Sequence, residues 1–182
     1  MVQIRRVIFI VMIVSVGGFL WLAQEQQNFE RGAIGSVAHA QPGHQAPSFK
    51  AKTFLGEDFQ LDQARKSGIV LYFWTSWCPY CQASSEAIEE AYQTYGNEIN
   101  MIGVNAGQHD RRSDAEQFIE RNDLHFINVV DENGAISSNY FVPPVPTTVF
   151  IDQNGIIVHR KTGAISSTEL EAEIESLLKG ES

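Results

Sequence analysis

One continuous apolar run of strand length, residues 69–74, predicts a strand that is buried on both faces. Two further strands are predicted at residues 99–104 and 126–130. A continuous apolar run is typical of inner strands in a sheet whose faces are covered by other elements. We therefore expect a central sheet built around residues 69–74.

Two hairpins are predicted beside these strands. Apolar and polar residues alternate over residues 48–61, with a glycine at the turn, which indicates a hairpin at the start of the domain. Residues 147–151 and 156–159 flank the dipeptide Asn154-Gly155. Because Asn-Gly favours the tight turns of hairpins, a second hairpin is expected there.

Three segments repeat apolar residues at helical spacing. The first ends at Gly96, the second opens with a capping box of Ser113 and Glu116, and the third opens with Ser166 and Glu169. The predicted buried positions are Ile88, Ala91, Tyr92 and Tyr95 in the first helix, Phe118 and Ile119 in the second, and Leu170, Ile174, Leu177 and Leu178 in the third.

The order of these elements predicts an α/β domain with a mixed central sheet flanked by helices. With 182 residues, 43% hydrophobic and 19% charged, the chain is long enough for one well-cored domain plus extra segments. The formal net charge is −9, and the acidic excess lies beyond residue 40. No nucleic-acid partner is expected, because such binding rests on neutralising phosphates.

Residues 7–23 form an apolar run without a charge. As a helix it would be about 26 Å long, close to the thickness of a hydrocarbon core of about 30 Å. Arg5 and Arg6 precede the run, so the positive-inside rule leaves residues 1–6 in the cytosol. We predict a single-pass anchor in the cell membrane, with the C-terminal domain on the extracytoplasmic side.

A cleaved signal peptide is the alternative, because Ala38-His39-Ala40 has the small-x-small form of a cleavage site. This tripeptide lies well past the end of the apolar run, which favours the anchor. Residues 24–45 lack apolar periodicity and are predicted to be a tether. In both cases residues 46–182 form the domain, in a compartment where disulfides persist.

Cys78 and Cys81 are the only cysteines of the chain, and they form a Cys-Pro-Tyr-Cys pair. Haem attachment requires a histidine directly after the second cysteine, where this chain has Gln82. A zinc site requires further clustered ligands, and the five histidines are scattered. A disulfide ring this small removes little entropy from the unfolded chain, so a purely structural role is also disfavoured. Reversible thiol–disulfide chemistry remains, with no cofactor and no resident metal expected.

The pair falls where a strand ends and a helix begins. If Cys78 occupies the helix N-terminus, unsatisfied backbone N–H groups and the helix dipole stabilise its thiolate for attack on a partner disulfide. Cys81, one helical turn further, would be more buried and would resolve the mixed disulfide as the pair forms its redox-active Cys78–Cys81 bond. Pro79 costs no hydrogen bond in the first helical turn. Trp77 is a candidate for shielding the sulfur and contacting substrate, although a plain packing role is equally open.

A second motif precedes a predicted strand at Val145-Pro146-Thr147. A proline that leads directly into a central strand suggests a cis peptide bond, although an ordinary loop proline is the alternative. If the two motifs face each other, the backbone at Val145 would be placed to pair with an extended partner, which makes Val145 and Pro146 candidate substrate-binding residues.

These motifs resemble the ResA/TlpA group of membrane-anchored, thioredoxin-like oxidoreductases. The likeness covers roughly residues 45–180 and implies a thioredoxin fold with a cis-Pro146 that faces Cys78. It also implies an N-terminal hairpin and an inserted helix–strand piece at about residues 106–130. The usual task of the group is to reduce disulfides outside the membrane, often in apocytochrome c before haem attachment. The matching segments are FWTSWCPYC (Phe73–Cys81), GVN (Gly103–Asn105), VPTTVFIDQNG (Val145–Gly155) and Thr162-Gly163.

Three positions depart from the pattern of this group or of thioredoxin. The glutamate that often follows the second cysteine by three residues is Ser84, and the proline two residues later is Glu86. The buried acid that precedes the motif in thioredoxin is replaced by Tyr72. The proton-handling residue of the relatives is therefore missing, and Glu86 is expected to be a solvated helix residue.

Three functions follow from the pair. The first is a reductant of disulfides in exported proteins, with apocytochrome c as one substrate and a membrane electron donor as a partner. The second is an oxidant or isomerase of exported proteins, because Pro79-Tyr80 resembles the glutaredoxin dipeptide, whose class is less reducing than thioredoxin. The third is a copper-delivery module, which is disfavoured because such relatives place three residues between the cysteines and use a specific distant histidine.

Overall fold

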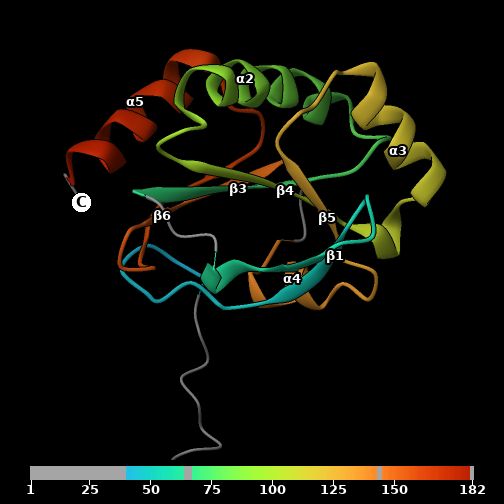
Figure 1. Ribbon diagram of the computed structural model, residues 1–182, viewed down its shortest axis with the longest axis horizontal. Coiled ribbons are helices and arrows are strands. Elements are labelled where there is room, and N and C mark those ends of the chain that lie inside the picture. Colours follow the sequence, from blue (N-terminus) through green and yellow to red (C-terminus); the bar gives the residue numbers. More distant parts are fainter. Residues whose placement is uncertain (1–39, 64–66, 143–144, 181–182) are drawn as a thin grey trace, which may run out of the picture. The chain divides into compact units, whose positions relative to one another are not determined.

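A computed structural model describes residues 40–63, 67–142 and 145–180 (Figure 1). Seven strands form one mixed sheet in the order β2-β1-β5-β4-β3-β6-β7. The strands are β1 (Lys50–Thr53), β2 (Asp58–Gln60), β3 (Gly68–Trp74), β4 (Asn100–Asn105), β5 (Ile127–Val130), β6 (Thr147–Asp152) and β7 (Ile157–Thr162). The helices are α2 (Pro79–Tyr95), α3 (Arg112–Arg121), α4 (Ala135–Asn139) and α5 (Ser167–Lys179), with 3-10 turns η1 (Leu61–Gln63) and η2 (Gly107–His109).

Strand β3 is the central strand that was predicted, and all seven of its residues are buried. It pairs in parallel with β4 and antiparallel with β6. Because successive side chains of a strand point to opposite faces, its residues divide between two cores. Tyr72 and Trp74 pack on the face that is covered by α2, α3 and α5, whereas Leu71 and Phe73 pack on the face that carries α4 (Figure 1).

The predicted hairpins and helices are confirmed, with one correction. Helix α3 begins at Arg112 and has no side-chain cap, so the expected capping box of Ser113 and Glu116 is wrong. Glu116 instead pairs with Arg112 at 2.9 Å across one helical turn. The predicted cap of the last helix is confirmed, because the Ser166 hydroxyl accepts a hydrogen bond from the backbone N–H of Glu169.

The domain begins earlier in the chain than the predicted boundary at residue 46. Ala40 is fully buried, and the backbone N–H of Gly43 donates to the Ile157 carbonyl at 2.8 Å. Residues 40–45 therefore pack along β7 and are not part of a tether, as the prediction of residues 24–45 had it. Apolar periodicity gave no signal there because these contacts are made by the backbone.

The N-terminal predictions lie outside the described residues. The anchor at residues 7–23, the tether at residues 24–39 and the first two residues of Ala38-His39-Ala40 all fall before residue 40. Within residues 40–180, apart from the two short gaps, no helix is long and apolar enough to cross a membrane.

The inserted helix–strand piece is confirmed as α3 and β5, between β4 and the second motif. It packs on the end of β3 through Trp74, whose ring stacks on Phe118 with centroids 4.7 Å apart. The Trp74 indole N–H donates to Asn128 Oδ1 at 3.1 Å, and Gly103 lies directly beneath this bond. A Cβ atom at Gly103 would overlap Asn128 Oδ1 and lie 2.9 Å from Trp74 Nε1. The glycine of the GVN motif is therefore explained by close packing.

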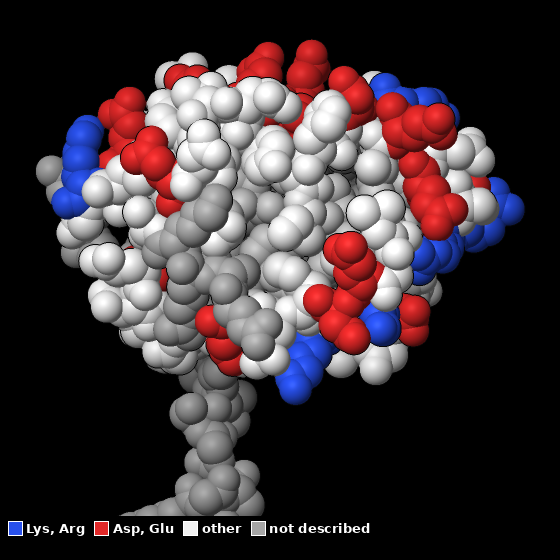
Figure 2. Space-filling view, in the orientation of Figure 1, with Lys and Arg blue, Asp and Glu red and all other residues white. Residues whose placement is uncertain are grey.

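The charge of the surface follows the composition. Figure 2 shows acidic side chains along the upper edge of this face, where Figure 1 places α2, and largely uncharged surface below them. Helix α2 carries Glu86, Glu89 and Glu90 and no basic residue.

Candidate active site

The two cysteines lie at the start of α2, in the order that the sequence predicts. Cys78 is the N-cap residue with an extended backbone (φ −86°, ψ 112°), and Pro79 is the first helical residue. Cys81 follows one turn later and is fully buried, while Cys78 retains 5% of its exposure. Both are free thiols, and the Cys81 N–H donates to the Cys78 carbonyl at 3.1 Å. Of the two thiols, only Cys78 lies at the helix N-terminus and retains any exposure.

The second motif faces this pair, as predicted. The Val145–Pro146 peptide bond is cis. The Cys78 thiol lies 3.6 Å from the Val145 carbonyl oxygen, 67 residues along the chain. Val145 is half-buried, and among the residues that the structure describes its backbone N–H has no hydrogen-bond partner. The structure thus brings Cys78, Val145 and Pro146 together.

Tyr72 occupies the position of the missing buried acid. Its hydroxyl donates to the Cys81 carbonyl at 2.6 Å, and its ring is fully buried. Burial raises the pKa of Tyr72 well above its ordinary value, and the neighbouring Cys81 raises it further. Tyr72 therefore stays protonated and fixes the backbone of the helix start, and it does not act as a proton acceptor near neutral pH.

The other two departures also have structural explanations. Ser84 is buried, its hydroxyl donates to the Tyr80 carbonyl at 3.1 Å, and it accepts from the backbone N–H of Ile165 at 3.2 Å. A serine at this position therefore joins α2 to the loop before α5. Glu86 is exposed, as expected of a solvated helix residue.

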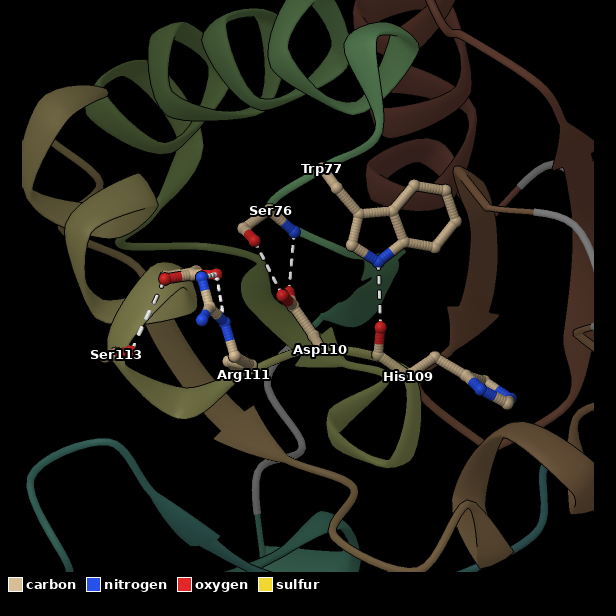
Figure 3. Close-up of polar contacts among 7 residues, drawn as sticks. Ser76, Trp77, His109, Asp110, Arg111 and Ser113 are labelled. Atoms are coloured by element: carbon tan, nitrogen blue, oxygen red, sulfur yellow. Dashed lines mark hydrogen bonds and ion pairs between the residues drawn. The ribbon is translucent and has the colours of Figure 1, made fainter.

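Asp110 was not singled out in the sequence, yet it holds the turn before Cys78 in place (Figure 3). Its carboxylate accepts hydrogen bonds from the Ser76 N–H and hydroxyl, both at 2.6 Å, and from Asn105 Nδ2 at 2.8 Å. The Trp77 indole N–H donates to the His109 carbonyl at 2.8 Å. The sequence offered one indication, since Asn105 ends β4 and Ser76 follows the end of the adjacent parallel strand β3. Polar side chains meet at such carboxyl ends.

A hollow of about 750 Å³ lies against the two residues that flank Cys78. Its lining includes Trp77 and Val145, which flank the cysteine, together with Phe141 and Val142. Trp77 and Phe141 are 61% and 47% exposed, which is high for large aromatic side chains. The candidate role of Trp77 thus changes from shielding the sulfur to forming one wall of this hollow.

The reduced protein is expected to lose stability as the pH rises above about 8.5. Burial raises the pKa of the Cys81 thiol well above its ordinary value, and Cys78 raises it further. An unfolded chain loses the cysteine proton near pH ~8.5, so above that pH the native state binds more protons than the unfolded state. The free energy of unfolding must then fall with rising pH, by up to about 1.4 kcal/mol per pH unit.

Urea unfolding between about pH 7.5 and 10 tests this sign in the full-length protein in detergent. The oxidised protein is the control, because its Cys81 has no proton to retain. A reduced protein whose stability follows that of the oxidised protein across this range contradicts the assignment of Cys81 as a buried thiol.

The thioredoxin-like α/β fold, with a Cys-x-x-Cys pair at a helix start beside a cis-proline, defines the class as thiol–disulfide oxidoreductases. The chain belongs to the AhpC/TSA family, whose model matches residues 42–160. The resemblance to the ResA group is confirmed by the relatives below, and so is an oxidoreductase activity.

Two relatives and one solved structure are similar to this chain over most of its length. Thiol-disulfide oxidoreductase ResA of Geobacillus kaustophilus is 32% identical over 136 residues, which cover 74% of this chain and 77% of the relative. Thioredoxin-like protein YneN of Bacillus subtilis is 29% identical over 167 residues, covering 91% and 94%. A secreted Mycobacterium tuberculosis disulfide oxidoreductase, homologous to E. coli DsbE, aligns with a TM-score of 0.64 and 28% identity over 70% of this chain and 95% of that structure.

In residues 40–180, outside the gaps at 64–66 and 143–144, no group of three or more His, Cys, Asp or Glu side chains is placed to hold a metal ion.

Proposed function

We propose that this protein exchanges disulfides with exported proteins outside the cytoplasm, through Cys78 and Cys81, and that it acts as a reductant with apocytochrome c among its substrates. The observation that carries the proposal is the placement of Cys78. Its thiol lies at the start of α2 and 3.6 Å from the Val145 carbonyl, while Cys81 is fully buried one turn behind it.

The geometry supports a two-step exchange. The Cys78 thiolate attacks one sulfur of a partner disulfide, a mixed disulfide forms, and the other partner sulfur leaves as a thiolate that takes up a proton. Cys81 then attacks the Cys78 sulfur and expels the second partner sulfur, which also becomes a thiol. Two electrons and two protons have then moved to the partner, and Cys78–Cys81 is a disulfide. A thiol reductant, expected in or at the membrane, must reduce it again.

The partner backbone has a place to bind. The Val145 carbonyl lies 3.6 Å from the Cys78 thiol, and an extended partner segment can pair with the Val145 backbone as a short added strand. Main-chain pairing of this kind accepts many sequences, because it reads the backbone and not the side chains.

Alkylation of the reduced full-length protein near neutral pH is expected to modify Cys78 more than about tenfold faster than Cys81. Cys81 is fully buried, and burial raises its thiol pKa, so its reactive thiolate is scarce. Mass spectrometry of the digested protein after timed iodoacetamide treatment measures both rates. Equal rates, or faster labelling of Cys81, would reverse the assigned roles.

An extracytoplasmic location is part of the proposal, supported by residues 7–23 and by the likeness to the secreted Mycobacterium tuberculosis oxidoreductase. Fractionation is expected to leave full-length protein in the membrane, with its C-terminal region open to protease added from outside. A soluble product that begins near Gln41 would show that Ala38-His39-Ala40 is cleaved. Protection of the C-terminal region in intact cells would refute the location.

The direction of electron flow has one competing interpretation. Pro79-Tyr80 between the cysteines is a dipeptide of the less reducing glutaredoxin class, which favours oxidation or isomerisation of exported proteins. Incubation of the pre-reduced protein with disulfide-bonded apocytochrome c decides between them. Reduction of the apocytochrome c disulfide to two thiols, with formation of the Cys78–Cys81 disulfide, supports the reductant, while oxidation of reduced exported proteins by the disulfide form supports the alternative.

A further inference from the structure

Cys81 has to become a thiolate inside the protein core when it resolves a mixed disulfide. Its side chain is fully buried, and burial is the largest of the causes that raise the pKa of its thiol. A buried charge is costly unless hydrogen-bond donors or an opposite charge compensate it. The groups around the Cys81 sulfur therefore decide how fast the second step of the exchange can run.

Two hydrogen bonds reach the Cys81 sulfur. One comes from the backbone N–H of Thr75 and the other from the hydroxyl of Tyr72, and each lowers the pKa of the Cys81 thiol. Among the residues that the structure describes, no cation lowers it. Cys78 raises it, but Cys78 carries no charge once it is joined to a partner in a mixed disulfide. In that intermediate burial opposes the Cys81 thiolate, and the two donors favour it.

Tyr72 presents its hydroxyl to Cys81 from the central strand of the sheet. Its ring is fully buried, and on β3 it pairs with Gly103 of β4 and Thr148 of β6. The hydroxyl donates to the Cys81 carbonyl at 2.6 Å and also contacts the Cys81 thiol. It carries one proton, and a charged acceptor forms the stronger bond. The O–H can therefore turn from the carbonyl to the sulfur as the thiolate forms, with no movement of the ring.

We propose that Tyr72 is a catalytic residue of the resolving step, in which its hydroxyl donates a hydrogen bond to the Cys81 sulfur while this sulfur is a thiolate. The Cys81 thiol gives its proton to a base in the solvent, and its sulfur attacks the Cys78 sulfur of the mixed disulfide. The bond between Cys78 and the partner breaks, and the partner sulfur leaves with the electron pair and takes up a proton. Tyr72 keeps its own proton throughout, because burial raises its pKa well above the ordinary value. The inference rests on the proposed function, since it assigns a role in the second step of that exchange.

The hydroxyl should accelerate the resolving step by roughly three- to fifteenfold. A hydrogen bond to a charged group shifts an equilibrium roughly ten- to hundredfold, and the population of the Cys81 thiolate rises by that factor. A thiolate of lower pKa is also a weaker nucleophile, which offsets about half of the gain on a logarithmic scale. The overall redox equilibrium should not change, because near neutral pH Cys81 is uncharged in both the dithiol and the disulfide.

The two steps can be timed in one experiment with 5,5′-dithiobis(2-nitrobenzoate). Reduced full-length protein in detergent is mixed with an excess of this disulfide in a stopped-flow instrument. Attack by Cys78 releases one coloured thiolate at a rate that depends on the reagent concentration, and resolution by Cys81 releases a second at a rate that does not. Tyr72→Phe should slow the second release roughly three- to fifteenfold and leave the first within about twofold of the wild type.

Tyr140→Phe is the matched control. Tyr140 is also fully buried, and its hydroxyl also donates to a backbone carbonyl, that of Pro47, at 2.7 Å. It lies in the core on the other face of the sheet from Tyr72. Both variants lose one bond between a hydroxyl and a carbonyl and should lose similar stability in urea, but Tyr140→Phe should keep both release rates of the wild type.

Two further measurements separate catalysis from a loss of structure. The equilibrium between the dithiol and the Cys78–Cys81 disulfide should differ by less than about twofold between Tyr72→Phe and the wild type. 3-Fluorotyrosine in place of Tyr72 keeps the shape of the ring and makes the hydroxyl a stronger donor, so it should speed the second release by up to about threefold. The fluorinated protein also decides the question if Tyr72→Phe shows no cooperative unfolding transition.

The inference is overturned if the second release keeps its wild-type rate in Tyr72→Phe, if Tyr140→Phe slows it equally, or if the fluorinated residue leaves it unchanged. Equal slowing of both releases in Tyr72→Phe would also overturn it, because the hydroxyl would then act on the fold of the site and not on the Cys81 thiolate. A wild-type protein that releases no second thiolate would contradict the proposed function itself, and this inference with it.

Discussion

Replacement of Cys81 by serine is expected to turn the protein into a covalent trap for its partners. Cys78 can still attack a partner disulfide, but no second thiol is left to expel the partner from the mixed disulfide. Net reduction should fall to the rate that small external thiols support, a loss of at least about a thousandfold. Non-reducing electrophoresis of cells with this variant should show adducts that disappear on reduction.

Two controls sharpen this test. Cys78→Ser removes the attacking thiol and should give no adducts, because Cys81 is fully buried. Mass spectrometry of the trapped partners then separates the substrates, since apocytochrome c supports the maturation role and a broad set of exported proteins supports a general oxidoreductase. If Cys81→Ser gives no adducts, or Cys78→Ser gives the same ones, the assigned roles of the two thiols are wrong.

Gly103→Ala should destabilise the domain by roughly 2–5 kcal/mol, far more than most glycine-to-alanine changes. The added methyl group would occupy the position of Asn128 Oδ1 and press on the Trp74 indole N–H. Since Trp74 is fully buried, breaking its bond to Asn128 leaves polar groups without partners in the core. Urea unfolding of wild type and variant, followed by tryptophan fluorescence, measures the loss.

A double-mutant cycle tests the stated cause. Asn128→Ala makes room for the new methyl group, so Gly103→Ala should cost at least about 1 kcal/mol less in that background than in the wild type. If the two changes add, the loss arises elsewhere in the sheet and the proposed contact is not its origin.

Much of the fold could be predicted because its elements carry strong periodic patterns. Six of the seven buried residues of β3, residues 69–74, form one apolar run, and the position of Cys78 followed from the strand before it and the helix after it. Helix α4 was missed because its five residues (Ala135–Asn139) are too short to show a helical period. Its turn at Phe141 was missed because residue type argues against a left-handed backbone there.

The site could be predicted only in part. Cys78 and Pro146 lie in short motifs that can be recognised from neighbouring residues in the sequence. The structure places the two motifs face to face. Asp110 acts through contacts to Ser76, 34 residues away, so its role depends on the fold and not on its neighbours in the chain. Residues 40–45 were assigned to the tether because backbone pairing with β7 leaves no trace in the side-chain pattern.

The redox equilibrium of Cys78 and Cys81 tests the central claim most directly. The full-length protein is equilibrated in buffers of graded thiol–disulfide ratio, quenched with acid and alkylated. Mass spectrometry then gives the number of alkylated thiols. We expect one reversible transition between a dithiol and an intramolecular disulfide, with a two-electron slope of about 30 mV per tenfold change in the ratio of the two forms. A pair that stays reduced throughout, or that forms only intermolecular disulfides, would contradict it.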